Sequence, residues 1–258
     1  MLTANSDTGP SVLLTDVQPI LASPEATRAV TIGHDLLLDN GIFGFDVDDI
    51  RSRPFNLLRS QVRKYLRRSQ AKLIGVISAT PGVGKTFVAC NLAAAISRIP
   101  GVDTYLVDLD LRRPSVGERF GLAQRPGVQD YLLEDLDDLA AAAFRPADQR
   151  LVVLPSSGGP APSAELLDNP RADRLFAGLR ALPEQAVVIV DMPPVFANDD
   201  AAIIASRVDA LLFVVEDGVT TGKQIKDGIR LLAPTPVLGT VLNRYRRGLV
   251  ADEYGYGF

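Results

Sequence analysis

Cysteine, histidine and tryptophan are nearly absent from this sequence of 258 residues, which has one cysteine, one histidine and no tryptophan. With Cys90 alone, no disulfide can form within the chain, which is typical of a reducing compartment. His34 has no cysteine or second histidine beside it, so we assign it no metal site. No apolar run approaches the roughly 18 residues that cross a bilayer, and the N-terminus lacks the basic start of a secretion signal. These absences predict a cytoplasmic protein, which would reach a membrane only through a partner.

The chain does contain enough apolar residues for a large core. Hydrophobic residues make up 47% of it, and its formal net charge of −4 gives no sign of nucleic-acid binding. Residues 72–243 alternate between apolar runs and helical patterns without a break, which indicates one domain. We expect a loosely packed and partly disordered N-terminal arm over residues 1–50, a domain over 51–243 and a flexible tail over 244–258.

Six short, almost uninterrupted apolar runs predict strands that are covered on both faces of a parallel sheet. Helical patterns over residues 164–179 and 221–232 lie between strands, and a basic amphipathic helix over 55–68 precedes them. This alternation predicts an α/β fold, a doubly wound and mostly parallel sheet with helices on both faces and ligands at the carboxyl ends of its strands. The predicted strands are residues 72–77, 104–107, 151–154, 186–190, 210–215 and 237–242.

The loop between the first predicted strand and the helix after it has the composition of a phosphate-binding loop. Gly82 and Gly84 let the backbone curl around an anion, and the first turn of the helix aims unpaired N–H groups at it. Lys85 would reach the β- and γ-phosphates, and the Thr86 hydroxyl is a hard oxygen suited to Mg²⁺. Ala79 stands where the strict pattern has glycine. The residues expected to bind the nucleotide here are Pro81, Gly82, Val83, Gly84, Lys85, Thr86 and Phe87.

Three aspartates directly follow predicted strands. Asp108 and Asp110 are two residues apart, so in extended backbone they point to the same side, and Asp191 follows another strand. Each of them alone could be a capping or turn residue, but beside a phosphate loop the three indicate a shared site. Mg²⁺ prefers such oxygen ligands and keeps most of its water. The sequence therefore predicts a magnesium and polyphosphate site at this edge of the sheet.

With these motifs the sequence resembles the bacterial tyrosine kinases of capsule and exopolysaccharide synthesis, in their separate cytoplasmic form, within the MinD/ParA-like P-loop ATPase superfamily. The likeness covers about residues 50–258 and depends on three motifs, residues 79–86, 106–114 and 188–194. The Asp-x-Asp-x-Arg pattern of the second motif is the most discriminating. The resemblance implies a tyrosine kinase that uses ATP and Mg²⁺ and releases ADP.

The resemblance also implies roles for individual residues. Asp108 would act on the incoming tyrosine hydroxyl as base or orienter, with Lys85 and Asp110 completing the catalytic group. Thr86, Asp110 and Asp191 would hold the metal. Asn243 lies where related ATPases recognise adenine, so it joins the residues expected to bind the nucleotide.

Kinases of this family phosphorylate a tyrosine-rich tail of a neighbouring subunit in a ring, and the matching acceptors here are Tyr254 and Tyr256. An ordinary frayed terminus is the alternative for this tail. The resemblance implies that tail phosphorylation regulates polymerisation and export of the polysaccharide, and that a transmembrane co-polymerase completes the active state. The family's Glu-x-x-Arg-x-x-Arg signature of ring assembly is reduced at residues 53–59 to its last arginine, which leaves the homo-oligomer open.

Two alternatives to the kinase stay open. A ParA- or MinD-like ATPase shares the fold and the asparagine on the adenine side, but such proteins carry a signature lysine where this chain has Thr80. A non-kinase, ATP-binding regulatory subunit of a polysaccharide export complex would account for the reduced ring signature. Tyr254 and Tyr256 favour the kinase over this second alternative.

Overall fold

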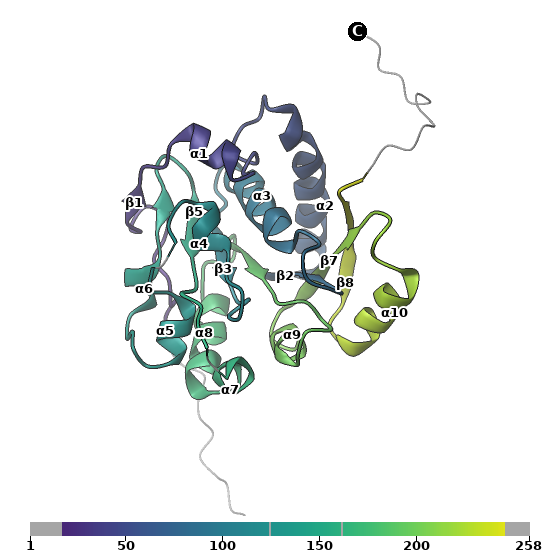
Figure 1. Ribbon diagram of the computed structural model, residues 1–258. Coiled ribbons are helices and arrows are strands. Elements are labelled where there is room, and N and C mark those ends of the chain that lie inside the picture. Colours follow the sequence, from purple (N-terminus) through teal and green to yellow (C-terminus); the bar gives the residue numbers. More distant parts are fainter. Residues whose placement is uncertain (1–16, 124, 161, 246–258) are drawn as a thin grey trace, which may run out of the picture.

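Six parallel strands form the central sheet of the computed structural model, which describes residues 17–123, 125–160 and 162–245 (Figure 1). Their order across the sheet is β5-β3-β6-β2-β7-β8, and every neighbouring pair is parallel. The predicted α/β sheet and all six of its predicted strands are confirmed. The strands are β2 Leu73–Ser78, β3 Thr104–Asp108, β5 Leu151–Leu154, β6 Val187–Asp191, β7 Ala210–Glu216 and β8 Val237–Asn243.

Helices cover both faces of this sheet, as predicted for a doubly wound fold (Figure 1). Along β6, Val188 and Val190 belong to one apolar cluster and Val187 and Ile189 to the other, because successive side chains of a strand alternate between its faces. One cluster includes side chains of α2 and α3, and the other includes side chains of α5, α7, α8 and α9. These helices, with α10 at the sheet edge, are α2 Arg53–Ser69, α3 Lys85–Ser97, α5 Val128–Leu132, α7 Ser163–Leu167, α8 Pro170–Arg180, α9 Asp200–Ala205 and α10 Gly222–Leu231.

Two predicted elements differ in detail from the structure. The helical pattern over residues 164–179 is two helices, because Asn169 caps α8 by accepting a hydrogen bond from the N–H of Ala172, and proline follows it. Strand β8 lies at the edge of the sheet, and its Leu242 is 51% exposed, so the expected cover on both faces is wrong there. Short elements that the sequence did not predict are β1 Ala29–Val30, α1 His34–Asp39, a 3₁₀ helix Ile50–Ser52, α4 Val116–Arg119, α6 Leu139–Ala142 and β4 Arg145–Pro146.

The described part of the N-terminal segment, residues 17–50, packs more closely than the loose arm expected from the sequence. Its Leu21 and Ile42 are buried in the two apolar clusters. Asn91 on α3, itself buried, accepts hydrogen bonds from the N–H groups of Phe43 at 2.7 Å and Gly44 at 2.9 Å. These contacts join residues far apart in sequence, so no local periodicity in the sequence predicts them. In the part of the chain that the structure describes, no helix is long and apolar enough to span a bilayer.

Replacing Gly44 with alanine tests this packing. A Cβ at position 44 would lie 2.3 Å from the carbonyl oxygen of Asn91 and 2.9 Å from the Cβ of Ala94, so the segment would have to shift. We expect Gly44→Ala to lower the free energy of unfolding by about 1–3 kcal/mol in urea denaturation. Gly33→Ala is the matched control, because nothing lies within 4 Å of its added Cβ. Equal midpoints for both variants would contradict the packing of this segment against α3.

Candidate functional site

The loop from β2 into α3 forms a cradle of backbone N–H groups. Gly82 and Gly84 have φ angles of 79° and 96°, in the region that side chains disfavour. Helix α3 begins directly after Gly84, so its first N–H groups face the space above the loop. A Cβ on Gly84 would also meet the Nδ2 of Asn243, so a side chain there would displace the Asn243 amide as well as strain the backbone.

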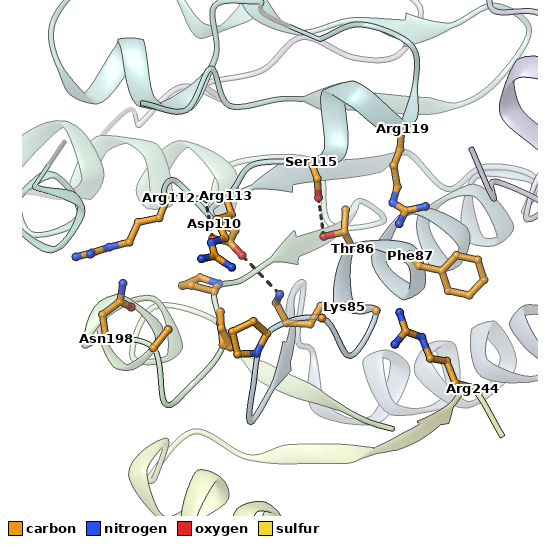
Figure 2. Close-up of a pocket in the computed structure, with 16 residues that line it drawn as sticks. Lys85, Thr86, Phe87, Asp110, Arg112, Arg113, Ser115, Arg119, Asn198 and Arg244 are labelled. Carbon is orange, nitrogen blue, oxygen red and sulfur yellow. Dashed lines mark hydrogen bonds and ion pairs between the residues drawn. The ribbon is translucent and has the colours of Figure 1, made fainter. Parts of the chain in front are cut away.

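Lys85 faces a carboxylate across this cradle. Its Nζ lies 3.5 Å from the Oδ2 of Asp110, and the lysine is 7% exposed (Figure 2). Burial raises the pKa of the Asp110 carboxyl, and the neighbouring Lys85 charge partly opposes that rise. The ion pair therefore holds the Lys85 ammonium group beside the loop. A phosphate bound there would compete with the Asp110 carboxylate for this ammonium group.

Thr86 and Asp191 present oxygen atoms suited to a hard cation. The Thr86 hydroxyl donates to Asp191 Oδ2 at 2.6 Å and accepts from Ser115 Oγ at 3.1 Å. Asp191 Oδ1 is buried and has no hydrogen-bond partner among the described residues, so this oxygen is available to a metal or its water. The described residues contain no cluster of three His, Cys, Asp or Glu side chains that could hold a metal. The arrangement fits Mg²⁺, which takes few protein ligands together with phosphate oxygens and water.

Asp108 is enclosed behind this site. It is fully buried, and its carboxylate accepts hydrogen bonds from the N–H groups of Asp110 at 3.1 Å and of Ser115 and Val116 at 3.0 Å each. Burial, with the nearby Asp191 charge next, raises the pKa of Asp108 well above its usual value. Asp110, rather than Asp108, lines the cavity beside the loop.

The cavity has a volume of about 530 Å³ and two distinct ends. Figure 2 shows Phe87 and Arg244 at one end, Arg112 and Asn198 at the other, and Lys85 between them. Most of the predicted loop residues line it, namely Pro81, Gly82, Gly84, Lys85, Thr86 and Phe87.

Two predicted nucleotide-binding residues, Val83 and Asn243, do not line the cavity. The Val83 side chain is buried in the core, so the predicted contact of this residue with the nucleotide would be made by its backbone. Asn243 donates from Nδ2 to the Val83 carbonyl at 2.8 Å and so braces the loop. The predicted acceptors Tyr254 and Tyr256 lie outside the described residues.

Sequence reasoning missed several polar residues of the cavity. Arg119 donates to the Asn40 carbonyl at 2.7 Å, and its guanidinium lies 5.9 Å from the Phe87 ring centre. No motif marks this arginine, because short α4 positions it through tertiary packing. Arg112 belongs to the Asp-x-Asp-x-Arg motif, which is the signal that could have placed it here. The other residues missed are Arg113, Ser115, Asn198 and Arg244.

The raised pKa of Asp191 predicts how the ligand-free protein responds to pH. Burial raises this pKa to about 6, so the stability linked to protonated Asp191 is fully present below about pH 4 and lost as pH rises through 6. Asp191→Asn removes that loss. We therefore subtract the free energy of unfolding of the parent chain from that of Asp191→Asn, both measured by urea denaturation with EDTA. We expect this difference to increase by about 3 kcal/mol from pH 4 to pH 8. Asp39→Asn, on the surface of α1, is the control, and parallel curves for Asp191→Asn and the parent would contradict the prediction.

Comparisons with known proteins agree with this geometry. Residues 74–253 match the CobQ/CobB/MinD/ParA nucleotide binding domain. The chain is 30% identical to the tyrosine-protein kinase YwqD of Bacillus subtilis over 209 residues, which are 80% of this chain and 86% of YwqD. The solved kinase domain of the Escherichia coli tyrosine kinase ETK superposes with a TM-score of 0.72 at 26% identity, and covers 90% of this chain and 94% of that domain.

Other relatives are much longer than this chain. It spans between 27% and 31% of the length of four of them. It is 32% identical to the succinoglycan biosynthesis transport protein ExoP of Rhizobium meliloti over 69% of its own length and 23% of ExoP. The chain belongs to the CobQ/CobB/MinD/ParA nucleotide-binding family, and within it to the bacterial tyrosine-protein kinases.

Proposed function

We propose that this protein is an ATP- and Mg²⁺-dependent protein-tyrosine kinase that phosphorylates Tyr254 and Tyr256 of a second copy in trans. The observation that carries the proposal is the meeting of Lys85, Thr86 and Asp110 in one cavity above the glycine loop. Such a cavity supplies the positioning and charge neutralisation on which phosphoryl transfer depends. The membership of the chain among the tyrosine-protein kinases supports the choice of acceptor.

In this proposal, different residues along the cavity bind the phosphates, hold the metal and support the loop. The backbone N–H groups of the loop and the Lys85 ammonium group bind the phosphates of ATP. To bind them, Lys85 breaks its ion pair with Asp110. Thr86, Asp191 and Asp110 would hold Mg²⁺, which supplies neutralisation of the phosphate charge. Asn243 holds the loop in place through its hydrogen bond to the Val83 carbonyl.

The transfer itself needs a carboxylate for the phenol proton. The tyrosine oxygen bonds to the γ-phosphorus as the bridging bond to ADP breaks, and the hydroxyl proton passes to an aspartate. The resemblance assigns this role to Asp108. Because Asp108 is enclosed by three N–H donors and Asp110 lines the cavity, we assign proton acceptance or orientation to Asp110 and support of the turn to Asp108.

Regulation and partners follow from the same proposal. A cytoplasmic kinase of this kind would act on polysaccharide polymerisation and export, recruited to the membrane's inner face by a transmembrane co-polymerase. The name of ExoP, a biosynthesis transport protein, supports a polysaccharide system. We expect weak activity in isolation and stronger activity with the co-polymerase's cytoplasmic segment.

One observation keeps the regulatory-subunit alternative in view. Arg59, the remaining arginine of the ring signature, donates to the Ala95 carbonyl at 3.2 Å within its own chain. This hydrogen bond uses one donor of the guanidinium to brace α2 against α3. The ParA- or MinD-like alternative is less supported, because Thr80 stands where those ATPases have lysine.

Intact-mass analysis after incubation with Mg-ATP tests the kinase directly. The parent chain should gain phosphate that maps to Tyr254 or Tyr256, most strongly with a co-polymerase cytoplasmic segment added. Lys85→Met should lose this signal by about 100-fold or more, because a buried charge that faces the phosphates is removed. Lys226→Met, an exposed lysine on α10, is the control. Mg-ATP binding by calorimetry without any phosphotyrosine would favour the regulatory subunit.

The two aspartates of the Asp-x-Asp-x-Arg motif can be separated by their effects. Asp110→Asn should lower kcat by about 100-fold, because its carboxylate lines the cavity beside Lys85. Asp108→Asn replaces one accepting oxygen by a donor, so it should also lower the free energy of unfolding by about 1–3 kcal/mol. A loss of kcat for Asp108→Asn alone, with full stability, would return the proton role to Asp108.

A further inference from the structure

At the end of the cavity away from the nucleotide loop, the charged side chain of Arg112 is anchored by neighbouring polar groups. Arg112 and Asn198 lie at this end, and Phe87 and Arg244 lie at the opposite end (Figure 2). Lys85 lies between the two ends. An ATP molecule with its phosphates on Lys85 would leave this far end open for the second reactant. The residues there therefore bear on which acceptor segment the site takes.

Arg112 is fixed along one edge only. Its Nε donates to Ser163 Oγ at 2.8 Å and lies 3.3 Å from Asp200 Oδ2. Ser163 and Asn198 donate to the same Asp200 oxygen at 2.6 Å and 2.9 Å. Asp200 is 1% exposed, whereas the Arg112 side chain is 53% exposed. The buried carboxylate therefore anchors the Nε edge and leaves the two Nη groups facing outward.

Positive charge is in excess along the cavity. Among its lining residues, Asp110 is the one carboxylate, and it pairs with Lys85. Arg112 makes its one ion pair with Asp200 through Nε, and Arg113 makes no ion pair within the described residues. Both arginines are exposed. An anionic group is the ligand that this arrangement would attract.

The proposed acceptor segment carries such groups. Asp252 and Glu253 directly precede Tyr254, whereas Tyr256 lies between two glycines. In extended backbone, successive residues advance about 3.3 Å, so a carboxylate one or two positions before a tyrosine remains close to it. The charges of the segment and of the cavity end are complementary.

We propose that Arg112, positioned by Asp200 and Ser163, forms a subsite for the acidic side chains that precede the acceptor tyrosine of a second copy of this chain. This inference rests on the proposed kinase function and deepens it by naming the acceptor class. Tyr254 is then the preferred acceptor, and Tyr256 is a poor one.

Peptide kinetics with the full chain test the subsite. The enzyme carries Tyr254→Phe and Tyr256→Phe to remove its own acceptors, and the substrates are a peptide of residues 249–258 and its double variant Asp252→Asn, Glu253→Gln. We expect the neutral peptide to show a KM about tenfold higher at similar kcat. Arg112→Gln and Asp200→Asn should raise the KM for the acidic peptide to that same value, and Arg112→Lys should restore part of the loss. Arg230→Gln, on the surface of α10, is the control.

Charge reversal separates the subsite from misfolding. Arg112→Glu should prefer a peptide with Asp252→Lys and Glu253→Lys over the parent peptide, a reversal that a misfolded enzyme cannot produce. Equal kcat/KM for acidic and neutral peptides in the parent enzyme, with Tyr254 and Tyr256 phosphorylated equally, would overturn the inference and leave the kinase intact. Bound Mg-ATP in calorimetry without transfer to any peptide would overturn the kinase proposal, and this inference with it.

Discussion

A lysine and three aspartates meet at the carboxyl edge of the sheet, and the rest of the structure depends on keeping this charge in place. Asp108 and Asp191 are paired in register on β3 and β6, and both are fully buried. Buried carboxylates are unfavourable unless they are paired or bound to a ligand, and the raised pKa values of Asp108, Asp110 and Asp191 express that penalty. In the proposed function, Mg²⁺ and the phosphates of ATP would complete this site, and their binding would relieve the penalty and stabilise the fold.

Ser115 links the two halves of this charged edge. Its N–H donates to Asp108 and its hydroxyl donates to Thr86, so the loop after β3 is tied to the first turn of α3. A cation bound at the Thr86 hydroxyl would therefore act on the same loop that carries Asp110 and Arg112. Under the proposed function, the contacts of Ser115 would connect the nucleotide side of the cavity to the side proposed for the acceptor.

The sequence predicts the parts of this protein whose signal is local. Uninterrupted apolar runs mark the strands, and glycine spacing marks the loop, because both patterns reflect the backbone of a few consecutive residues. The docking of residues 17–50 could not be read in the same way, since it depends on Asn91 meeting Phe43 and Gly44 across 48 and 47 positions. Arg119 is equally hidden, because a one-turn helix with no periodicity brings it to the cavity. Strand β8 is exposed because it is the last strand at one edge of the sheet. The composition of a strand does not reveal its place in the strand order.

The two ends of the cavity support the proposed phosphoryl transfer over simple ATP hydrolysis. Hydrolysis needs one anionic ligand and a water molecule, for which a single cluster of basic groups around the phosphates is sufficient. Here arginines stand at both ends, Arg244 on the side of Phe87 and Arg112 on the side of Asn198, with Lys85 between them. In the proposed subsite, the exposed guanidinium of Arg112, anchored by the buried Asp200 carboxylate, would recognise a second charged reactant with a geometry fixed before that reactant arrives. A bound nucleotide with its phosphates on Lys85 would leave the Arg112 end of the cavity open, and this end is where a protein acceptor would bind in the proposed phosphoryl transfer.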